Sequence, residues 1–139
     1  MRTGVVLAKQ GGVLTKILIP IKMGIGSVIG DGNQYLPWIH IDDLCSIYFK
    51  AIEDTKIIGS FNAVAPEHTT NKQFMKTIAR NLDKPFWFPK IPPIVIKVIL
   101  GKMSEMIISG SRISSDKIRK SGFVFKYPNL ESALKQLEL

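Results

Sequence analysis

The sequence predicts an α/β fold in which a small mixed sheet and several helices form a single domain over residues 1–139. Three runs rich in β-forming residues, 2–8, 38–41 and 61–65, alternate with segments whose apolar residues repeat at helical spacing. The chain is 45% hydrophobic and 22% charged, which is ordinary for a globular domain long enough to bury a core.

The charge distribution limits the classes of function. Residues 70–139 hold 13 basic and 5 acidic side chains, whereas residues 1–69 hold 6 of each. A basic half is typical of a solvated surface, and it also fits binding to nucleic acid, a membrane surface or a phosphorylated small ligand. The apolar residues 91–108 are interrupted by Lys97, Lys102 and Glu105, so we expect no membrane-spanning segment.

Cysteine and histidine are scarce. Cys45 is the single cysteine, so a disulfide within the chain is impossible, and a reducing compartment, the cytoplasm, is expected. His40 and His68 with one thiol do not make a usual zinc ligand set, and we predict no metal site.

The first predicted strand, residues 2–8, is apolar on both faces, which is typical of a strand inside a sheet covered on both sides. No partner strand precedes it, so we expect an N-terminal half to be missing. A helix follows, and Pro20 is expected to stop or kink it near its end. Its predicted buried residues are Val13, Leu14, Ile17, Leu18 and Ile21. The run from Gly24 to Gly30 is not interpreted as a dinucleotide loop, because a helix precedes it and a turn follows.

Residues 38–44, Trp-Ile-His-Ile-Asp-Asp-Leu, form a short apolar strand that leads directly into a helix. Asp42 or Asp43 is expected to cap this helix. Its predicted buried stripe is Leu44, Ile47, Tyr48, Ala51 and Ile52. His40 lies at the hinge within reach of Asp43, and such a pair either ties the strand to the helix or fixes a tautomer that contacts a ligand.

The second half continues the alternation of strands and helices. Thr70 and Gln73 fit a capping box for a helix that extends to about Leu82. Its predicted core stripe is Phe74, Ile78, Ala79 and Leu82. Residues 94–100 are predicted to be helical, and Asn129 is predicted to cap a last helix. The buried face of that last helix is predicted to be Leu130, Ala133, Leu134 and Leu137.

These segments together resemble the C-terminal part of extended short-chain dehydrogenases/reductases of the NAD-dependent epimerase/dehydratase type. R-T-G-V-V-L resembles the strand that follows the catalytic helix in these enzymes, and W-I-H-I-D-D-L resembles their F/W-I-H-V-x-D-L/V segment. The glycine turn before that segment, the run F-N-A-V-A-P-E-x-x-T-N-K-Q-F and the closing segment, with a short capped helix and a strand near Pro128, also resemble the family. The match covers nearly the whole chain in order, and it is most similar to a branch of undefined substrate.

The resemblance implies a Rossmann-type enzyme that transfers hydride between NAD or NADP and a sugar nucleotide or related alcohol. The family uses a glycine-rich loop and a Tyr-x-x-x-Lys pair, and this chain has neither, because Tyr35, Tyr48 and Tyr127 lack a lysine four positions later. We therefore expect the chain alone to be non-catalytic and to bind no cofactor. Leu36 stands where nucleotide-sugar epimerases commonly have a diphosphate-binding arginine, which argues against such a ligand unless Arg112 or a lysine compensates.

In a complete enzyme, the resemblance implies two groups of binding residues and no catalytic residue in this chain. The side chains expected to face a small-molecule substrate are Gln34, Trp38, His40 and Arg112. The residues expected to line the sheet end near NAD or NADP are Arg2, Val5 and Leu7. Arg112 follows Gly110-Ser111, and an arginine there either forks onto a phosphate or carboxylate or is simply exposed.

Two other functions remain open: a stand-alone binding or interaction module, and a basic single-strand nucleic-acid binder. Phe86, Trp87 and Phe88 lie between lysines, but aromatic residues bracketed by prolines more often cover a core, so we expect only weak, salt-sensitive nucleic-acid binding. Without an upstream neighbour, the strand from Thr3 to Leu7 would expose its edges and its apolar faces. A homodimer through this strand is expected, with strand swapping or a disordered arm as alternatives.

Overall fold

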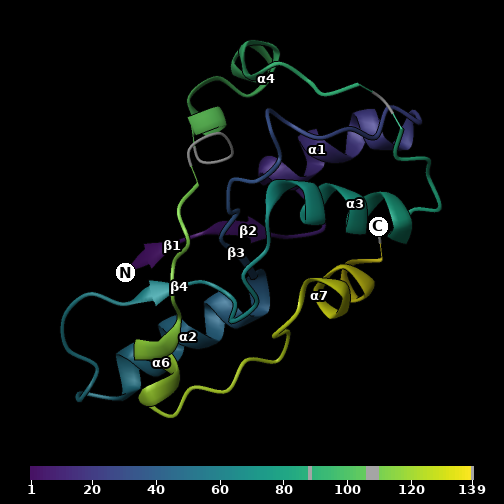
Figure 1. The fold of residues 1–139 in the computed structure, drawn as a ribbon. Coiled ribbons are helices and arrows are strands. Elements are labelled where there is room, and N and C mark those ends of the chain that lie inside the picture. The colour runs from purple at the N-terminus through teal and green to yellow at the C-terminus, as the bar shows by residue number, and fades with distance from the viewer. Residues whose placement is uncertain (88, 106–109, 139) are drawn as a thin grey trace.

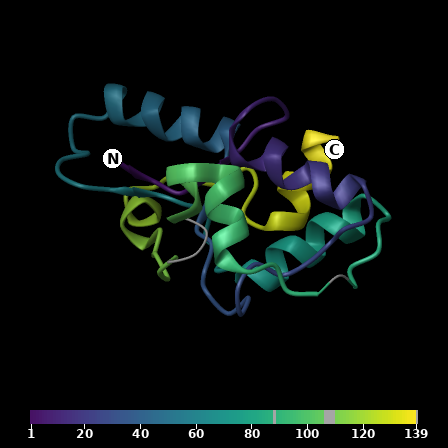
Figure 2. The same cartoon turned by 90° about the horizontal axis from the view of Figure 1, so that it is seen from above.

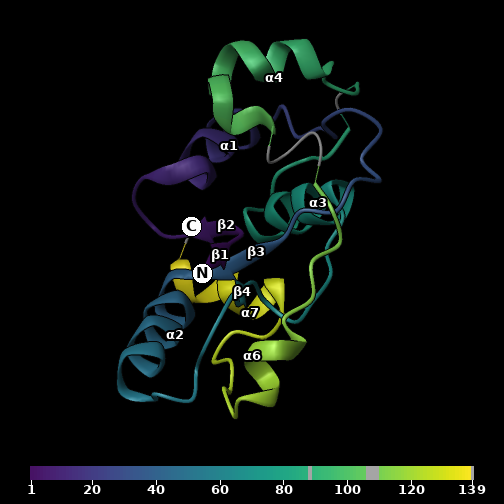
Figure 3. The ribbon, with the colours of Figure 1, turned by 90° about the vertical axis from the view of Figure 1, so that its left-hand side faces the viewer.

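A computed structural model describes residues 1–87, 89–105 and 110–138. The elements are β1 (Arg2–Thr3), β2 (Val5–Leu7), α1 (Gly12–Lys22), β3 (Trp38–His40), α2 (Ile41–Glu53), β4 (Asn62–Ala63), α3 (Asn71–Asn81), α4 (Pro93–Leu100), the 3-10 helix η1 (Gly101–Met103), α6 (Asp116–Lys120) and α7 (Leu130–Leu137). The strands lie in the middle, with α1 and α4 toward one end and α2 and α6 toward the other (Figures 1 and 3). The predicted α/β class is confirmed.

The strands form two small parallel ladders. β2 pairs with β3 so that Val5 lies opposite Trp38, and β1 pairs with β4 so that Thr3 lies opposite Ala63. Antiparallel pairing among the described residues is limited to one isolated bridge. The backbone N–H of Ala65 donates to the carbonyl of Trp38 at 2.6 Å, which connects the end of β4 to β3.

Gly4 divides the predicted strand 2–8 into β1 and β2. Its N–H donates to the carbonyl of Ala63 at 3.2 Å, and the next N–H, of Val5, donates to the carbonyl of Pro37 at 2.8 Å. A Cβ at position 4 would come within 2.6 Å of the Pro37 carbonyl oxygen. Glycine is therefore required where the chain changes its partner strand.

The predicted exposure of the strand from Thr3 to Leu7 is wrong. Val5 and Leu7 are buried in the core that also contains α1, and Val6 is half-buried against a second cluster. The strand's apolar faces are therefore covered within one chain, which weakens the burial argument for a homodimer. One edge of β2 has no strand partner among the described residues, and the homodimer stays a prediction.

The predictions for α1, α3 and α7 agree with the structure, except that Leu82, predicted in the core stripe of α3, is half-buried and follows the helix. All predicted stripe residues of α1 and α7 are buried, and α1 continues to Lys22 through Pro20. At the start of α3 the N–H of Gln73 donates to Thr70 Oγ1 at 3.3 Å, and the N–H of Thr70 donates to Gln73 Oε1 at 2.9 Å. Asn129 Oδ1 accepts the N–H of the third residue of α7 at 2.9 Å. The predicted capping box of α3 and the predicted cap of α7 are confirmed.

The predicted burial of α2 is only partly correct. Ile47 is buried, while Leu44 and Ala51 are half-buried. Three large apolar side chains of the helix are exposed: Tyr48, Phe49 and Ile52. The helix lies along the outer edge of the molecule in two perpendicular views (Figures 2 and 3). Periodicity correctly identified an apolar stripe, but none of the described elements covers its outer part.

The expected strand near Pro128 does not form. The chain between α6 and α7 is irregular, and two of its backbone N–H groups bond to the buried carboxylate of Asp43. The N–H of Lys126 donates to Oδ1 at 2.8 Å and the N–H of Tyr127 to Oδ2 at 3.0 Å. One side chain thus satisfies donors that a neighbouring strand would otherwise satisfy.

We predict that Asp43→Ala lowers the free energy of unfolding by about 2–4 kcal/mol, because two N–H groups lose a charged acceptor. Urea unfolding followed by circular dichroism measures the change. Asp42→Ala is the matched control, because the Asp42 carboxylate is half-exposed and its contacts with the Tyr127 hydroxyl, at 3.5 Å, and with Lys126 Nζ, at 3.9 Å, are long. Equal losses in the two variants would contradict the assigned role of Asp43.

Candidate functional site

His40 ends β3 and caps α2. Its Nδ1 accepts the N–H of Asp42 at 3.1 Å, so the predicted cap by Asp42 or Asp43 is wrong. A ring nitrogen that accepts a hydrogen bond carries no proton, so the neutral ring is protonated on Nε2. That N–H donates to Gln136 Oε1 at 2.8 Å. The sequence left two interpretations of His40, a link between strand and helix or a contact with a ligand. The structure shows the link between β3 and α2, and it is made through Asp42 and not through the expected Asp43.

The C-terminal part of the chain encloses the His40 ring. The ring is 1% exposed, and its centroid lies 4.0 Å from that of Tyr127. Tyr127 and Gln136 are 87 and 96 residues away in sequence. No local pattern indicates either contact, and sequence reasoning missed both. In this chain His40 holds α7 against the end of β3.

Trp38 and Gln34 also have partners inside the chain. Trp38 is buried, and its indole N–H donates to Thr69 Oγ1 at 3.1 Å. The side-chain amide of Gln34 donates to the carbonyl of Ile29 at 3.0 Å, while the N–H of Ile29 donates to Asn71 Oδ1 at 3.0 Å. Two side-chain amides, of Asn71 and Gln34, thus bond to the backbone N–H and to the carbonyl of Ile29. These contacts fix the loop that precedes β3.

Arg112 is the most accessible of the four side chains expected to face substrate. It is exposed and lines a cleft together with Tyr35 and His68, whose rings meet edge-on with centroids 6.4 Å apart. The free space in the cleft is about 10 Å³, roughly the room of one water molecule. Thr69 also lines the cleft and connects it to Trp38. Sequence reasoning missed His68 and Tyr35 as lining residues, because the segments that carry them are far apart in sequence.

The three residues expected near a cofactor differ in exposure. Arg2 is exposed, and its backbone N–H donates to the carbonyl of Phe61 at 2.8 Å. Val5 and Leu7 are enclosed by the core, so their side chains present no surface to a ligand in this chain. The assignment of all three to a cofactor stays a prediction for a complete enzyme.

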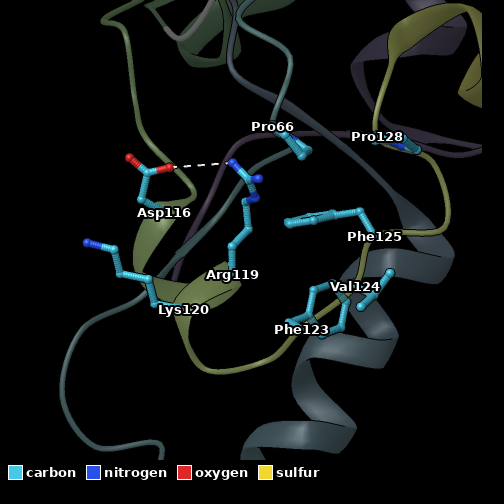
Figure 4. A pocket seen from close by; sticks show the side chains of 8 residues that line it. All are labelled: Pro66, Asp116, Arg119, Lys120, Phe123, Val124, Phe125 and Pro128. Carbon is cyan, nitrogen blue, oxygen red and sulfur yellow. Dashed lines mark ion pairs between the residues drawn. The ribbon is translucent and has the colours of Figure 1, made fainter.

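A broad, open hollow of about 640 Å³ lies beside α6 (Figure 4). Arg119 faces it and forms an ion pair with Asp116 at 3.6 Å. Phe125 lies opposite and packs edge-on against Phe123, with ring centroids 4.9 Å apart. None of the seven predicted site residues lines this hollow.

Metal-binding clusters and membrane-spanning helices were also predicted to be absent. Within residues 1–87, 89–105 and 110–138, no three histidine, cysteine or acidic side chains gather closely enough to hold a metal ion. No helix in this described part of the chain combines the length and apolarity needed to cross a bilayer.

Comparison of sequences relates this chain to epimerase family proteins. Residues 91–137 match a domain of unknown function, DUF1731. The chain is 35% identical over 138 residues to mouse epimerase family protein SDR39U1, covering 99% of this chain and 47% of that protein. It is 41% identical over 136 residues to epimerase family protein YfhF of Bacillus subtilis, covering 98% of this chain and 44% of YfhF. The chain spans about half the length of the curated relatives it matches.

Comparison of structures agrees. Human epimerase family protein SDR39U1, solved with NADPH, matches with a TM-score of 0.89 and 34% identity, over 98% of this chain and 46% of that one. UDP-glucose 4-epimerase of Thermotoga maritima, solved with UDP-glucose, matches with a TM-score of 0.72 over 99% of this chain and 43% of that one; at 21% identity this shows the fold alone. The resemblance to the C-terminal part of an epimerase-type short-chain dehydrogenase/reductase is confirmed.

We predict that the His40 ring is protonated on Nε2 in the folded chain at neutral pH. Nitrogen-15 NMR of histidine-labelled protein distinguishes the two ring nitrogens by shift and by coupling to the ring protons. The expected result is an unprotonated Nδ1, with Gln136→Leu perturbing the Nε2 signal while Gln10→Leu, at another exposed glutamine, leaves it unchanged. A proton on Nδ1 would contradict the capping geometry.

Proposed function

We propose that this chain is the substrate-binding part of an NAD(P)-dependent epimerase-like oxidoreductase and does not catalyse by itself. The observation that carries this proposal is the likeness to human SDR39U1 across 98% of the chain, because that relative was solved with NADPH. The glycine-rich loop and the Tyr-x-x-x-Lys pair that such chemistry requires are not among these 139 residues. In this proposal, NAD or NADP is held by a nucleotide-binding half that corresponds to the unmatched part of the relatives.

Two unpartnered features support contact with such a half. The exposed apolar side chains of α2, Tyr48, Phe49 and Ile52, lie within five consecutive positions of one helix. A cluster of this kind marks an interaction surface more often than scattered exposed side chains do. One edge of β2 also lacks a strand partner among the described residues, and a further strand there would extend the ladder.

For the substrate, we propose that Arg112 contacts an anionic group and that Gln34, Trp38 and His40 position the surrounding backbone. Arg112 is exposed on a loop, whereas the other three bond to residues of their own chain. At the position where related epimerases carry an arginine, this chain has Leu36, which is uncharged and fully buried. It therefore offers no charge to a diphosphate. A small molecule with one phosphate or carboxylate therefore fits better than a nucleotide sugar.

We propose that the protein lies in the cytoplasm, because its single cysteine requires no oxidising compartment.

A single-strand nucleic-acid binder is less well supported. Phe86 packs against the core and Trp87 is 71% exposed, while Phe88 lies outside the described residues. Stacking of successive bases requires successive accessible rings, and among the described aromatic residues of this segment Trp87 alone is exposed, which provides a weak platform. Binding through the scattered lysines is therefore expected to be weak and salt-dependent.

We predict that calorimetric titration of the chain with NADPH or NADH gives no saturable heat. The helix N-terminus and glycine turn that hold a pyrophosphate are not in this sequence. Human SDR39U1, titrated with NADPH under the same conditions, serves as the positive control. Saturable binding by this chain near micromolar concentration would contradict the assignment of the cofactor to another half.

We also predict a one-to-one complex between this chain and the unmatched part of Bacillus subtilis YfhF, produced separately. Ile52→Lys, on the α2 face, is expected to weaken it at least about tenfold, because a charge replaces a buried apolar contact. Ile58→Lys is the control, because Ile58 is equally exposed but lies outside α2.

Light scattering measures the complex and also shows whether the chain alone is a homodimer. If the wild type forms no complex, or if the two variants weaken it equally, the proposed α2 contact is wrong.

A further inference from the structure

An apolar hollow of about 440 Å³, which we call the α1 pocket, opens beside α1. Helices α1 and α4 lie toward the same end of the molecule (Figures 1 and 3). The floor of the pocket consists of Ile17, Ile29 and Met75, which are almost completely buried. The floor residues come from α1, from the loop before β3 and from α3, so the pocket is bounded by segments distant in sequence.

The rim of the α1 pocket exposes apolar side chains to water. Ile19 is 57% exposed and Met23 is 71% exposed, and Val95 of α4 also lines the pocket. The volume lies in the range typical of small-molecule sites, about 300–1,000 Å³. A hollow enclosed by separate segments fits a compact or flexible small ligand better than a partner helix, which requires a long groove.

One basic side chain lies among these apolar residues. Lys16 is exposed and lines the pocket, and no ion pair of Lys16 is found within the described part of the chain. A ligand that fills the apolar floor and places a negative charge at the rim would therefore satisfy both features.

We propose that the α1 pocket binds a small anionic amphiphile, an acyl chain that ends in a carboxylate. The chain would lie on Ile17, Ile29 and Met75, and the carboxylate would pair with Lys16. The lining does not include Arg112, so this site is separate from the proposed substrate contact and does not depend on the proposed function.

Calorimetric titration of the 139-residue chain with decanoate, below its micelle concentration, tests the site. The expected result is saturable binding of one decanoate per chain. Ile19→Asp, which places a carboxylate on the rim, is expected to weaken binding at least about tenfold. Ile58→Asp makes the same substitution at an exposed isoleucine outside the α1 pocket and is expected to leave binding unchanged.

Lys16→Gln tests the charged contact separately. It is expected to weaken decanoate binding about two- to fivefold, as for an exposed ion pair, and to leave decanol binding unchanged. The proposal is overturned if decanoate does not saturate one site, if it binds only above its micelle concentration, or if Ile19→Asp and Ile58→Asp weaken its binding equally. Equal weakening of decanol and decanoate by Lys16→Gln would overturn the role of the lysine.

Discussion

Two buried polar side chains at the junction of β3 and α2 connect the first third of this chain to its C-terminal segment. His40 caps α2 through Nδ1 and reaches Gln136 of α7 through Nε2, while Asp43 binds the backbone at Lys126 and Tyr127. A buried carboxylate without donors is very unfavourable, so the position of Asp43 requires the C-terminal segment to pack against it. The pairing of β3 with β2 then brings α1 into the same core as α7.

Features decided within a few residues could be predicted from the sequence. The capping box of Thr70 and Gln73 and the cap by Asn129 involve residues three positions apart. The cap of α2 was not predictable in this way, because three polar side chains, His40, Asp42 and Asp43, stand close together in sequence at the start of the helix. Asp43 is unavailable for that role because its carboxylate binds donors 83 and 84 residues away, which no local pattern reveals. The burial of α2 was overestimated because periodicity identifies an apolar stripe but not the surface that covers it.

The candidate site shows the same limit. Gln34, Trp38 and His40 lie within seven consecutive positions of the sequence, but their side chains bond to different parts of the chain. Gln34 bonds to Ile29, Trp38 to Thr69 and His40 to Gln136. Arg112 instead meets Tyr35 and His68, a grouping produced only by the folded chain. These four residues therefore divide into one accessible cation and three residues whose side chains bond to their own chain.

Amide hydrogen exchange, measured by NMR on the 139-residue chain, tests most directly whether the junction makes one folded unit. We expect the amides of Tyr127, bonded to Asp43, and Ala65, bonded to Trp38, to open with the same free energy as that of Ile78 in α3. Exchange of the Tyr127 and Ala65 amides at the rate of an unstructured peptide, with Ile78 still protected, would contradict it. That result would show that β3 and the C-terminal segment need a partner in order to fold.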